Sequence, residues 1–126
     1  MSISVLNTYE SVETSDVKVW FKAAPIAKFP KNGGACIKYQ DKQIAVFNFT
    51  REKTWYACQN LCPHKMEMVL SRGMIGEENM EAKVACPLHK NTFSLKTGEN
   101  LNGSLEAIAT YPVKVEDGFV YVGFSE

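Results

Sequence analysis

Short segments in which apolar and polar residues alternate, separated by turn residues, run through most of the chain, and this pattern predicts strands rather than helices. The segments expected to be strands are Val17–Ala23, Ala35–Tyr39, Gln43–Thr50, Trp55–Cys58, Ala109–Glu116 and Phe119–Phe124. Asp117-Gly118 separates the last two, and a two-residue Asp-Gly connection is a strong signal for a β-hairpin. Only Ser104–Ile108 is expected to form a helical turn. The pattern as a whole predicts an all-β sandwich or barrel.

The character of the sequence changes between Asn60 and Gly98, where Pro, Gly, Met, Cys and His are frequent and the strand-like runs are short. A loop-rich stretch of this length inside a small protein usually carries a function. The chain has 126 residues, no internal repeat and no Pro/Gly/Ser-rich linker, so we expect one domain over residues 1–126.

Charge and hydropathy exclude several classes of function. Lys plus Arg and Asp plus Glu number 14 each, so nothing predicts nucleic acid or an anionic membrane as a partner. No run approaches the roughly 18 apolar residues of a membrane helix, and the first residues do not resemble a secretory signal. We therefore expect a cytoplasmic protein with reduced thiols, in which cysteines that lie near histidines are candidate metal ligands.

Two short segments combine these residue types: Cys62-Pro63-His64-Lys65 and Cys86-Pro87-Leu88-His89-Lys90. They contain both histidines of the protein, each separated from a cysteine by one or two residues. Two thiolates on one iron and two imidazoles on the other are the ligands of a Rieske-type [2Fe–2S] cluster. With two neutral imidazoles in place of two thiolates the cluster is less negative and accepts an electron more readily. We expect Cys62, His64, Cys86 and His89 to hold one such cluster, with the cysteines on the inner iron and the histidines toward solvent.

The main alternative metal for these four residues is zinc, because two Cys and two His also satisfy tetrahedral Zn²⁺. Zinc modules usually pair two cysteines in one half of the site and two histidines in the other. Here each half is mixed, which favours iron–sulfur. A zinc-stabilised binding module without a redox role stays open as a function of a different class.

The two segments form the Rieske signature, and their surroundings resemble a narrower family, the small subunit of assimilatory NAD(P)H-dependent nitrite reductase. Besides the cluster segments, the matching residues are Leu70–Gly73, Val84–Ala85, Phe93–Leu95, Thr97–Glu99 and Tyr111–Val115. The resemblance spans roughly Val17 to Phe124. It implies an antiparallel β base domain (about 17–54 and 99–124) and a small cluster-binding subdomain (about 55–98).

The resemblance also implies a function: electron transfer beside a large flavin and sirohaem subunit that reduces nitrite to ammonia. The chain would be part of an oxidoreductase without holding a complete active site, because both histidines are expected to bind metal and no dinucleotide-binding fingerprint is visible. A free-standing Rieske ferredoxin that supplies electrons to an oxygenase uses the same four ligands and remains the alternative. The sequences Leu70-Ser71-Arg72-Gly73 and Cys86–Lys90 favour the nitrite reductase subunit.

Comparison with the high-potential respiratory Rieske proteins bears on the redox potential. Those proteins carry a disulfide between the two loops, and the equivalent positions here are Glu67 and Leu88. They also place Ser and Tyr hydroxyls beside the cluster, and the comparable residues here are Asn91 and Phe93. The resemblance therefore implies a potential in the lower part of the Rieske range.

The other cysteines and the methionines are expected to be structural. Cys36 and Cys58 lie in strand-like runs and are expected to be small buried hydrophobic residues. The methionines between the two segments are expected to fill the irregular gap around the cluster; they are Met66, Met68, Met74 and Met80.

Two lysines follow the histidines directly. Lys65 and Lys90 either dock the chain onto an acidic partner surface or are simply solvated, and the sequence favours neither interpretation.

Overall fold

The computed structural model describes residues 9–88 and 90–126, and strands make up most of the regular structure in this part of the chain. The strands are β1 (Val19–Pro25), β2 (Gly33–Tyr39), β3 (Lys42–Phe49), β4 (Thr54–Gln59), β5 (Leu61–Cys62), β6 (Glu67–Met68), β7 (Met74–Glu78), β8 (Glu81–Ala85), β9 (Thr92–Ser94), β10 (Thr110–Tyr111), β11 (Val113–Glu116) and β12 (Phe119–Phe124). Three short 3₁₀ turns accompany them: η2 (Thr14–Asp16), η3 (Ile26–Lys28) and η4 (Leu70–Arg72). The predicted all-β class is confirmed.

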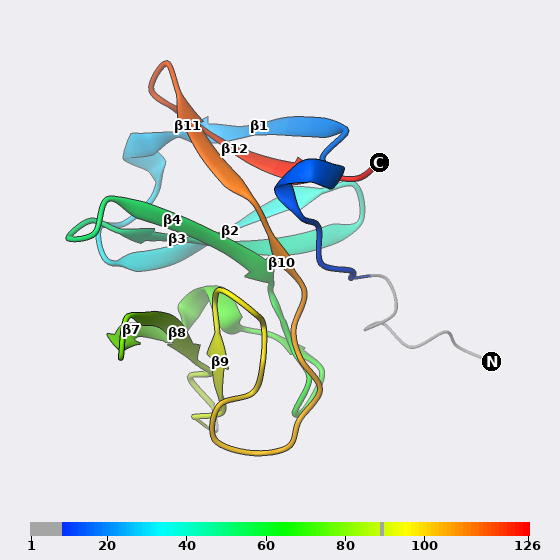
Figure 1. The fold of residues 1–126 in the computed structure, drawn as a ribbon, viewed down its shortest axis with the longest axis vertical. Coiled ribbons are helices and arrows are strands. Elements are labelled where there is room, and N and C mark those ends of the chain that lie inside the picture. Colours follow the sequence, from blue (N-terminus) through cyan, green and yellow to red (C-terminus); the bar gives the residue numbers. More distant parts are fainter. Residues whose placement is uncertain (1–8, 89) are drawn as a thin grey trace.

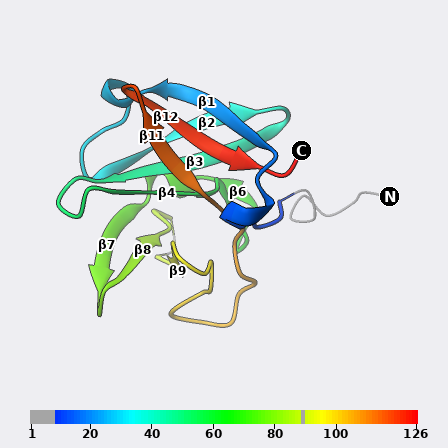
Figure 2. The same ribbon diagram turned by 45° about the horizontal axis from the view of Figure 1, so that its top comes forward.

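The strands form antiparallel sheets that lie in layers (Figures 1 and 2). One sheet has the order β1-β12-β11, and the next has the order β10-β4-β3-β2. A third sheet, β7-β8-β9, lies below them in Figure 1, and β5 pairs with β6 in a small ribbon. Within the described residues no helix has the length and apolar character needed to cross a membrane.

The predicted Asp-Gly hairpin is present between β11 and β12. Glu116 pairs with Phe119, and the two residues between them have positive φ angles, 52° at Asp117 and 81° at Gly118. A type I′ turn requires positive φ at both of its central residues, which explains why this dipeptide is a reliable signal.

Strand β3 is buried on both faces from Ile44 to Phe49. Ile44 and Val46 enter a core shared with the β1-β12-β11 sheet, whereas Ala45, Phe47 and Phe49 enter a second core on the opposite side. Because side chains alternate along a strand, the buried residues of β3 contribute to two cores, and the β10-β4-β3-β2 sheet is the central layer.

The second core is the one that reaches the two cluster segments. Cys62 and Cys86 belong to it, together with Leu70 from η4, Val84 from β8 and Phe93 from β9. The cysteines are therefore fixed by apolar packing against the central sheet and against the small β7-β8-β9 sheet.

The expected division into a base domain and a cluster-binding subdomain stays a prediction. Strand β4 pairs with β3 from Thr54 to Gln59, inside the central sheet. We therefore propose that the cluster-binding part begins after Gln59 rather than at residue 55.

The helical turn expected at Ser104–Ile108 was wrong, because these residues contain no helix. Their backbone N–H groups find partners elsewhere: Leu105 donates to Oδ1 of Asn100 (2.9 Å), and Ile108 donates to the carbonyl oxygen of Gly98 (2.8 Å). Ile108 is drawn into the second core, so tertiary packing prevails over the weak local preference.

Two buried groups predict how stability depends on pH. Burial raises the pKa of the Cys58 thiol and of the Tyr111 hydroxyl above their ordinary values of 9.0 and 10.0. Above those values the unfolded chain has lost protons that the folded chain still holds, so stability is fully present below about pH 9 and falls at higher pH. Each group can lower the free energy of unfolding by at most about 1.4 kcal/mol per pH unit.

Urea unfolding of the wild type, Cys58→Ala and Tyr111→Phe between pH 7 and pH 11 measures this effect. We expect a shallower alkaline decline in each variant and parallel curves below pH 8. An alkaline slope that neither substitution reduces would contradict the assignment.

Candidate functional site

Each of the two predicted cysteines lies at the base of a tight loop. Cys62 ends β5 and pairs with Glu67 of β6, so the chain between them turns back on itself. Cys86 follows β8, and its N–H donates to the carbonyl oxygen of Asn91 (2.8 Å). The N–H of Lys90 in turn donates to the carbonyl oxygen of Cys86 (2.9 Å), which closes the second loop.

The two loops face each other across a small hollow. It is lined by Cys62, His64, Lys65, Glu67, Val69, Cys86 and Leu88. Both cysteines are only 2% exposed, whereas His64 is exposed. The structure thus brings together three of the four predicted ligands, with the sulfurs inside and an imidazole outside. The fourth, His89, lies outside the described residues.

The electrostatics of the hollow depend on the closeness of the two thiols. Burial raises the pKa of Cys62 to about 11; the adjacent Cys86 thiol and the Glu67 carboxylate act in the same direction, and the backbone N–H of His64 opposes them. Two thiolates in this apolar setting would repel each other. A cation that binds both sulfurs displaces their protons and removes that repulsion, which couples metal binding to deprotonation.

The residues present fit a [2Fe–2S] cluster. One iron takes two cysteine sulfurs and the other takes two imidazoles, so each metal needs only two protein ligands. Over residues 9–88 and 90–126, which leave out His89, no three His, Cys, Asp or Glu side chains form a group placed to hold a single metal ion.

A second observation comes from Asn91, beside the second loop. Its Nδ2 is buried and has no hydrogen-bond partner among the described residues. An unpaired buried N–H costs about 1–3 kcal/mol. Inorganic sulfide and cysteine sulfur are acceptors that a bound cluster would bring to this part of the protein.

The surface around the hollow mixes basic and apolar side chains. Lys65 and Lys90 are exposed, and so are Met66 and Leu88. His64 lies on the same loop as Lys65 and Met66, so a molecule that approaches the imidazole also meets these side chains.

The expectation for the remaining cysteines was right for Cys58 and wrong for Cys36. Cys58 is fully buried in the second core, but Cys36 is exposed. Strand β2 is at the edge of the central sheet, and Cys36 lies on its solvent side. Its Sγ accepts from Nδ2 of Asn60 (3.6 Å) and lies 3.7 Å from Oε1 of Gln43.

The methionines do not fill a gap around the hollow. Met74 and Met80 are 77% and 81% exposed, on the β7–β8 hairpin. Met66 is also exposed, and Met68 packs on the first core, with the hydroxyl of Tyr9 3.9 Å from its Sδ. The expectation was wrong because it treated nearness in the sequence as nearness in space.

Sequence reasoning missed two buried amides, Gln59 and Asn60, which directly precede β5. The available signal was their position: two adjacent polar side chains interrupt an otherwise apolar run between Trp55 and Cys62.

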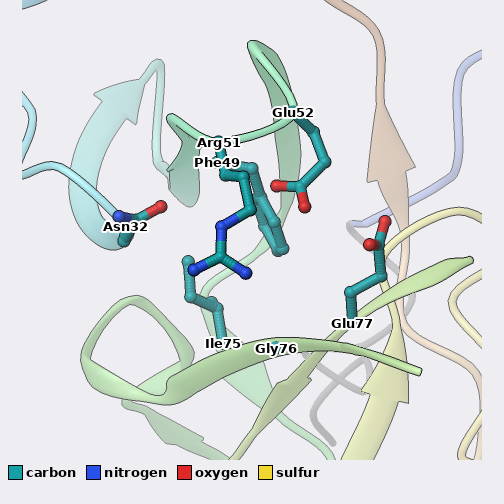
Figure 3. Close-up of a pocket in the computed structure, with 7 residues that line it drawn as sticks. All are labelled: Asn32, Phe49, Arg51, Glu52, Ile75, Gly76 and Glu77. Atoms are coloured by element: carbon teal, nitrogen blue, oxygen red, sulfur yellow. The ribbon is translucent and has the colours of Figure 1, made fainter.

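A separate hollow lies between the β3–β4 turn and β7 (Figure 3). Arg51 and Glu52 extend from the turn toward Ile75 and Glu77 of β7, over the ring of Phe49. Of the predicted ligands that the structure describes, Cys62, His64 and Cys86, none lines it. Its charges are of both signs, which favours no single class of ligand.

The layered β fold and the two loops over a buried pair of thiols are features of an iron–sulfur electron-transfer domain. The sequence profile described as the Rieske-like [2Fe–2S] domain matches residues 19–123. The chain belongs to this family, and its cofactor is a Rieske-type [2Fe–2S] cluster.

Relatives come from two groups of proteins. The small subunit of nitrite reductase (NADH) from Escherichia coli K12 is 34% identical, covering 69% of this chain and 81% of the relative. The large subunit of nitrite reductase [NAD(P)H] from Klebsiella oxytoca is 36% identical over 82% of this chain, which spans only 11% of that protein's length. The ferredoxin subunit of 3-phenylpropionate/cinnamic acid dioxygenase from Photorhabdus laumondii is 34% identical, covering 80% of this chain and 90% of the relative.

Among solved structures, that of the Escherichia coli protein NirD resembles this chain with a TM-score of 0.76. The two are 30% identical, and the match covers 86% of this chain and 98% of the other.

The burial of the four cysteines predicts their reactivity. In the native protein we expect an aromatic disulfide reagent to modify one thiol, that of Cys36, because it alone among the four is exposed. Partial burial raises the pKa of Cys36, so the reaction should be slower than with a free thiol. The other three should react only after unfolding. Counting released chromophore against time checks this, with Cys36→Ser as the control that should not react; rapid labelling of two or more thiols would contradict it.

Proposed function

We propose that Cys62, His64, Cys86 and His89 hold one Rieske-type [2Fe–2S] cluster, and that the chain transfers single electrons as the small subunit of an NAD(P)H-dependent nitrite reductase. The observation that carries the proposal is the buried pair of thiols beneath the exposed His64, in one hollow between two tight loops. A bound cluster supplies one-electron chemistry at this site.

Each part of the site has a distinct role. The apolar packing around Cys62 and Cys86 excludes water from the sulfur side of the hollow. The imidazole of His64 lies at the surface, where a partner can approach the site. Lys65 lines the same hollow as that imidazole, and Lys90 is exposed on the second loop; two such positive charges are suited to an acidic partner surface.

The assignment to nitrite reductase rests on the relatives and on the residues around the loops. The relatives from Klebsiella oxytoca and Escherichia coli K12 are nitrite reductase subunits. Leu70-Ser71-Arg72-Gly73 forms η4 and its end, and Leu70 is buried in the second core. The reduction of nitrite to ammonia would occur on a large flavin and sirohaem subunit, with this chain as its electron-transfer subunit. The cytoplasmic location expected from the sequence stays a prediction.

A second candidate is an electron-supplying ferredoxin of an aromatic-ring dioxygenase. The observation that favours it is the match to the Photorhabdus laumondii ferredoxin subunit, which this chain covers over 90% of its length. Both candidates use the same four ligands, so only the partner distinguishes them.

The ligand assignment predicts the spectra of the isolated protein. Protein purified without oxygen should be red-brown and, when reduced, should give a rhombic EPR signal of low average g, because two imidazoles and two thiolates ligate the irons. Cys62→Ser and His64→Ala should lose the colour, whereas Cys36→Ser should keep the wild-type spectrum. A colourless wild type with stoichiometric zinc would contradict the proposal.

The partner assignment predicts which protein co-purifies with this chain. Tagged protein expressed in its source cells should co-purify with a large subunit that contains flavin and sirohaem. The double variant Lys65→Glu/Lys90→Glu should bind that subunit about tenfold more weakly and with altered salt dependence. Lys18→Glu/Lys38→Glu changes the net charge equally, at exposed positions of other segments, and should bind normally. Co-purification with an oxygenase instead would favour the second candidate.

A further inference from the structure

The chain passes between the central sheet and the cluster-binding part at two neighbouring points. It leaves the sheet where β4 ends at Gln59, and it returns at Ala109, just before β10 (Figure 1). The backbone pairing of β4 with β10 stops at Cys58 and Thr110. Two amide side chains, those of Gln59 and Asn60, lie at this crossing and are 1% and 2% exposed.

The side chain of Gln59 continues the hydrogen bonding where the backbone pairing stops. Its Oε1 accepts from the N–H of Ala109 (2.8 Å), and its backbone N–H donates to the carbonyl oxygen of Ala109 (3.0 Å). Its Nε2 donates to the carbonyl oxygen of Leu61 (2.7 Å), one residue before Cys62. One buried amide therefore joins the outgoing strand, the returning strand and β5.

The side chain of Asn60 joins a different set of segments. Its Oδ1 accepts from the N–H of Ser71 in η4 (2.7 Å), and its Nδ2 donates to Oε1 of Gln43 in β3 (3.1 Å). Its carbonyl oxygen accepts from the N–H of Leu70 (3.0 Å), and its N–H donates to the carbonyl oxygen of Gln43 (2.9 Å). The loop that contains Cys62 and His64 thus begins and ends on one residue, which is bonded to the central sheet.

Both amides are buried, and so are the apolar residues on either side of them in the sequence, Cys58 and Leu61. Burial of an amide side chain costs free energy unless its polar atoms form hydrogen bonds. The hydrogen bonds of these two amides to other segments therefore explain why they are buried here. The side-chain bonds of Gln59 and Asn60 go to β2, β3, β5, η4 and Ala109, and none of them is a backbone pairing between strands.

We propose that Gln59 and Asn60 are positioning residues for the cluster: they fix the loop that contains Cys62 and His64 relative to the central sheet, and so fix the geometry in which Cys62 meets Cys86. Neither residue touches the sulfurs; both act through the backbone on either side of β5. The inference rests on the proposed ligation by Cys62 and is independent of the partner protein.

Two substitutions at Asn60 give a graded test. Asn60→Asp keeps an acceptor for the N–H of Ser71 and removes the donor to Gln43, whereas Asn60→Leu removes both. With the cluster-loaded protein, we expect loss of visible absorbance in the presence of an iron chelator to be about 10-fold to 100-fold faster in Asn60→Leu, and less accelerated in Asn60→Asp. We also expect broader lines or shifted g values in the reduced EPR spectrum, more so in Asn60→Leu than in Asn60→Asp, because the ligand geometry varies more when the loop is released.

The matched control is Asn48→Leu, a buried amide of β3 that lies on the same face of the strand as Ile44 and Val46, the face opposite the core that contains Cys62 and Cys86. It should leave the g values unchanged even where it lowers the unfolding midpoint. EPR spectra of both Asn60 variants that match the wild type would overturn the inference, and so would equal broadening in Asn48→Leu. If Asn60→Leu does not fold, Asn60→Asp and Gln59→Glu decide the outcome.

Cys62→Ser separates this inference from the proposal on which it rests. If that variant keeps a wild-type cluster, the ligand assignment fails and the positioning role fails with it. If it loses the cluster while the Asn60 variants retain wild-type spectra and stability toward the chelator, the ligands are correct and the positioning role alone is excluded.

Discussion

The whole arrangement depends on burial of the central sheet on both faces. Strand β3 has no solvent side between Ile44 and Phe49, because alternate side chains enter two different cores. One core joins the central sheet to the β1-β12-β11 sheet, and the other joins it to the segments that contain Cys62 and Cys86. A sheet with a polar outer face could not place two thiols in an apolar interior at the far side of the molecule.

The site combines an apolar interior with a polar surface over a short distance. On the inner side both thiols lie among aliphatic and aromatic side chains, and burial there raises the pKa of Cys62. On the outer side His64 and Lys65 are open to solvent. This gradient separates the two requirements of an electron carrier, since a protected sulfur side retains the metal and an accessible imidazole side admits a partner.

Local sequence signals predicted the elements that depend on local chemistry. The turn at Asp117-Gly118 needs two residues that tolerate positive φ, and the Cys62-Pro63-His64 segment pointed to the loop whose buried thiol and exposed imidazole line one hollow. Features that depend on distant contacts were not predictable in this way. The solvent side of Cys36 follows from the edge position of β2, and the extended path through Ile108 follows from the second core.

The contacts of the buried amides could not be predicted from local sequence either. Nothing in the neighbourhood of Gln59 in the sequence indicates that Ala109 will be its partner, because 50 positions separate them. The sequence shows that Gln59 and Asn60 are polar residues within an apolar run. What they connect is evident only in the fold, where the two crossings of the chain lie side by side.

The nearness of those crossings has an evolutionary consequence. Residues 60–108 leave and rejoin the central sheet at adjacent points, so they form an insertion whose two ends are held together by the host sheet. A segment with this geometry can be exchanged as a cassette without breaking the strand order of its host. Variation in the redox properties of such a protein can therefore arise in the insert, while surfaces on the β1-β12-β11 sheet evolve under separate selection.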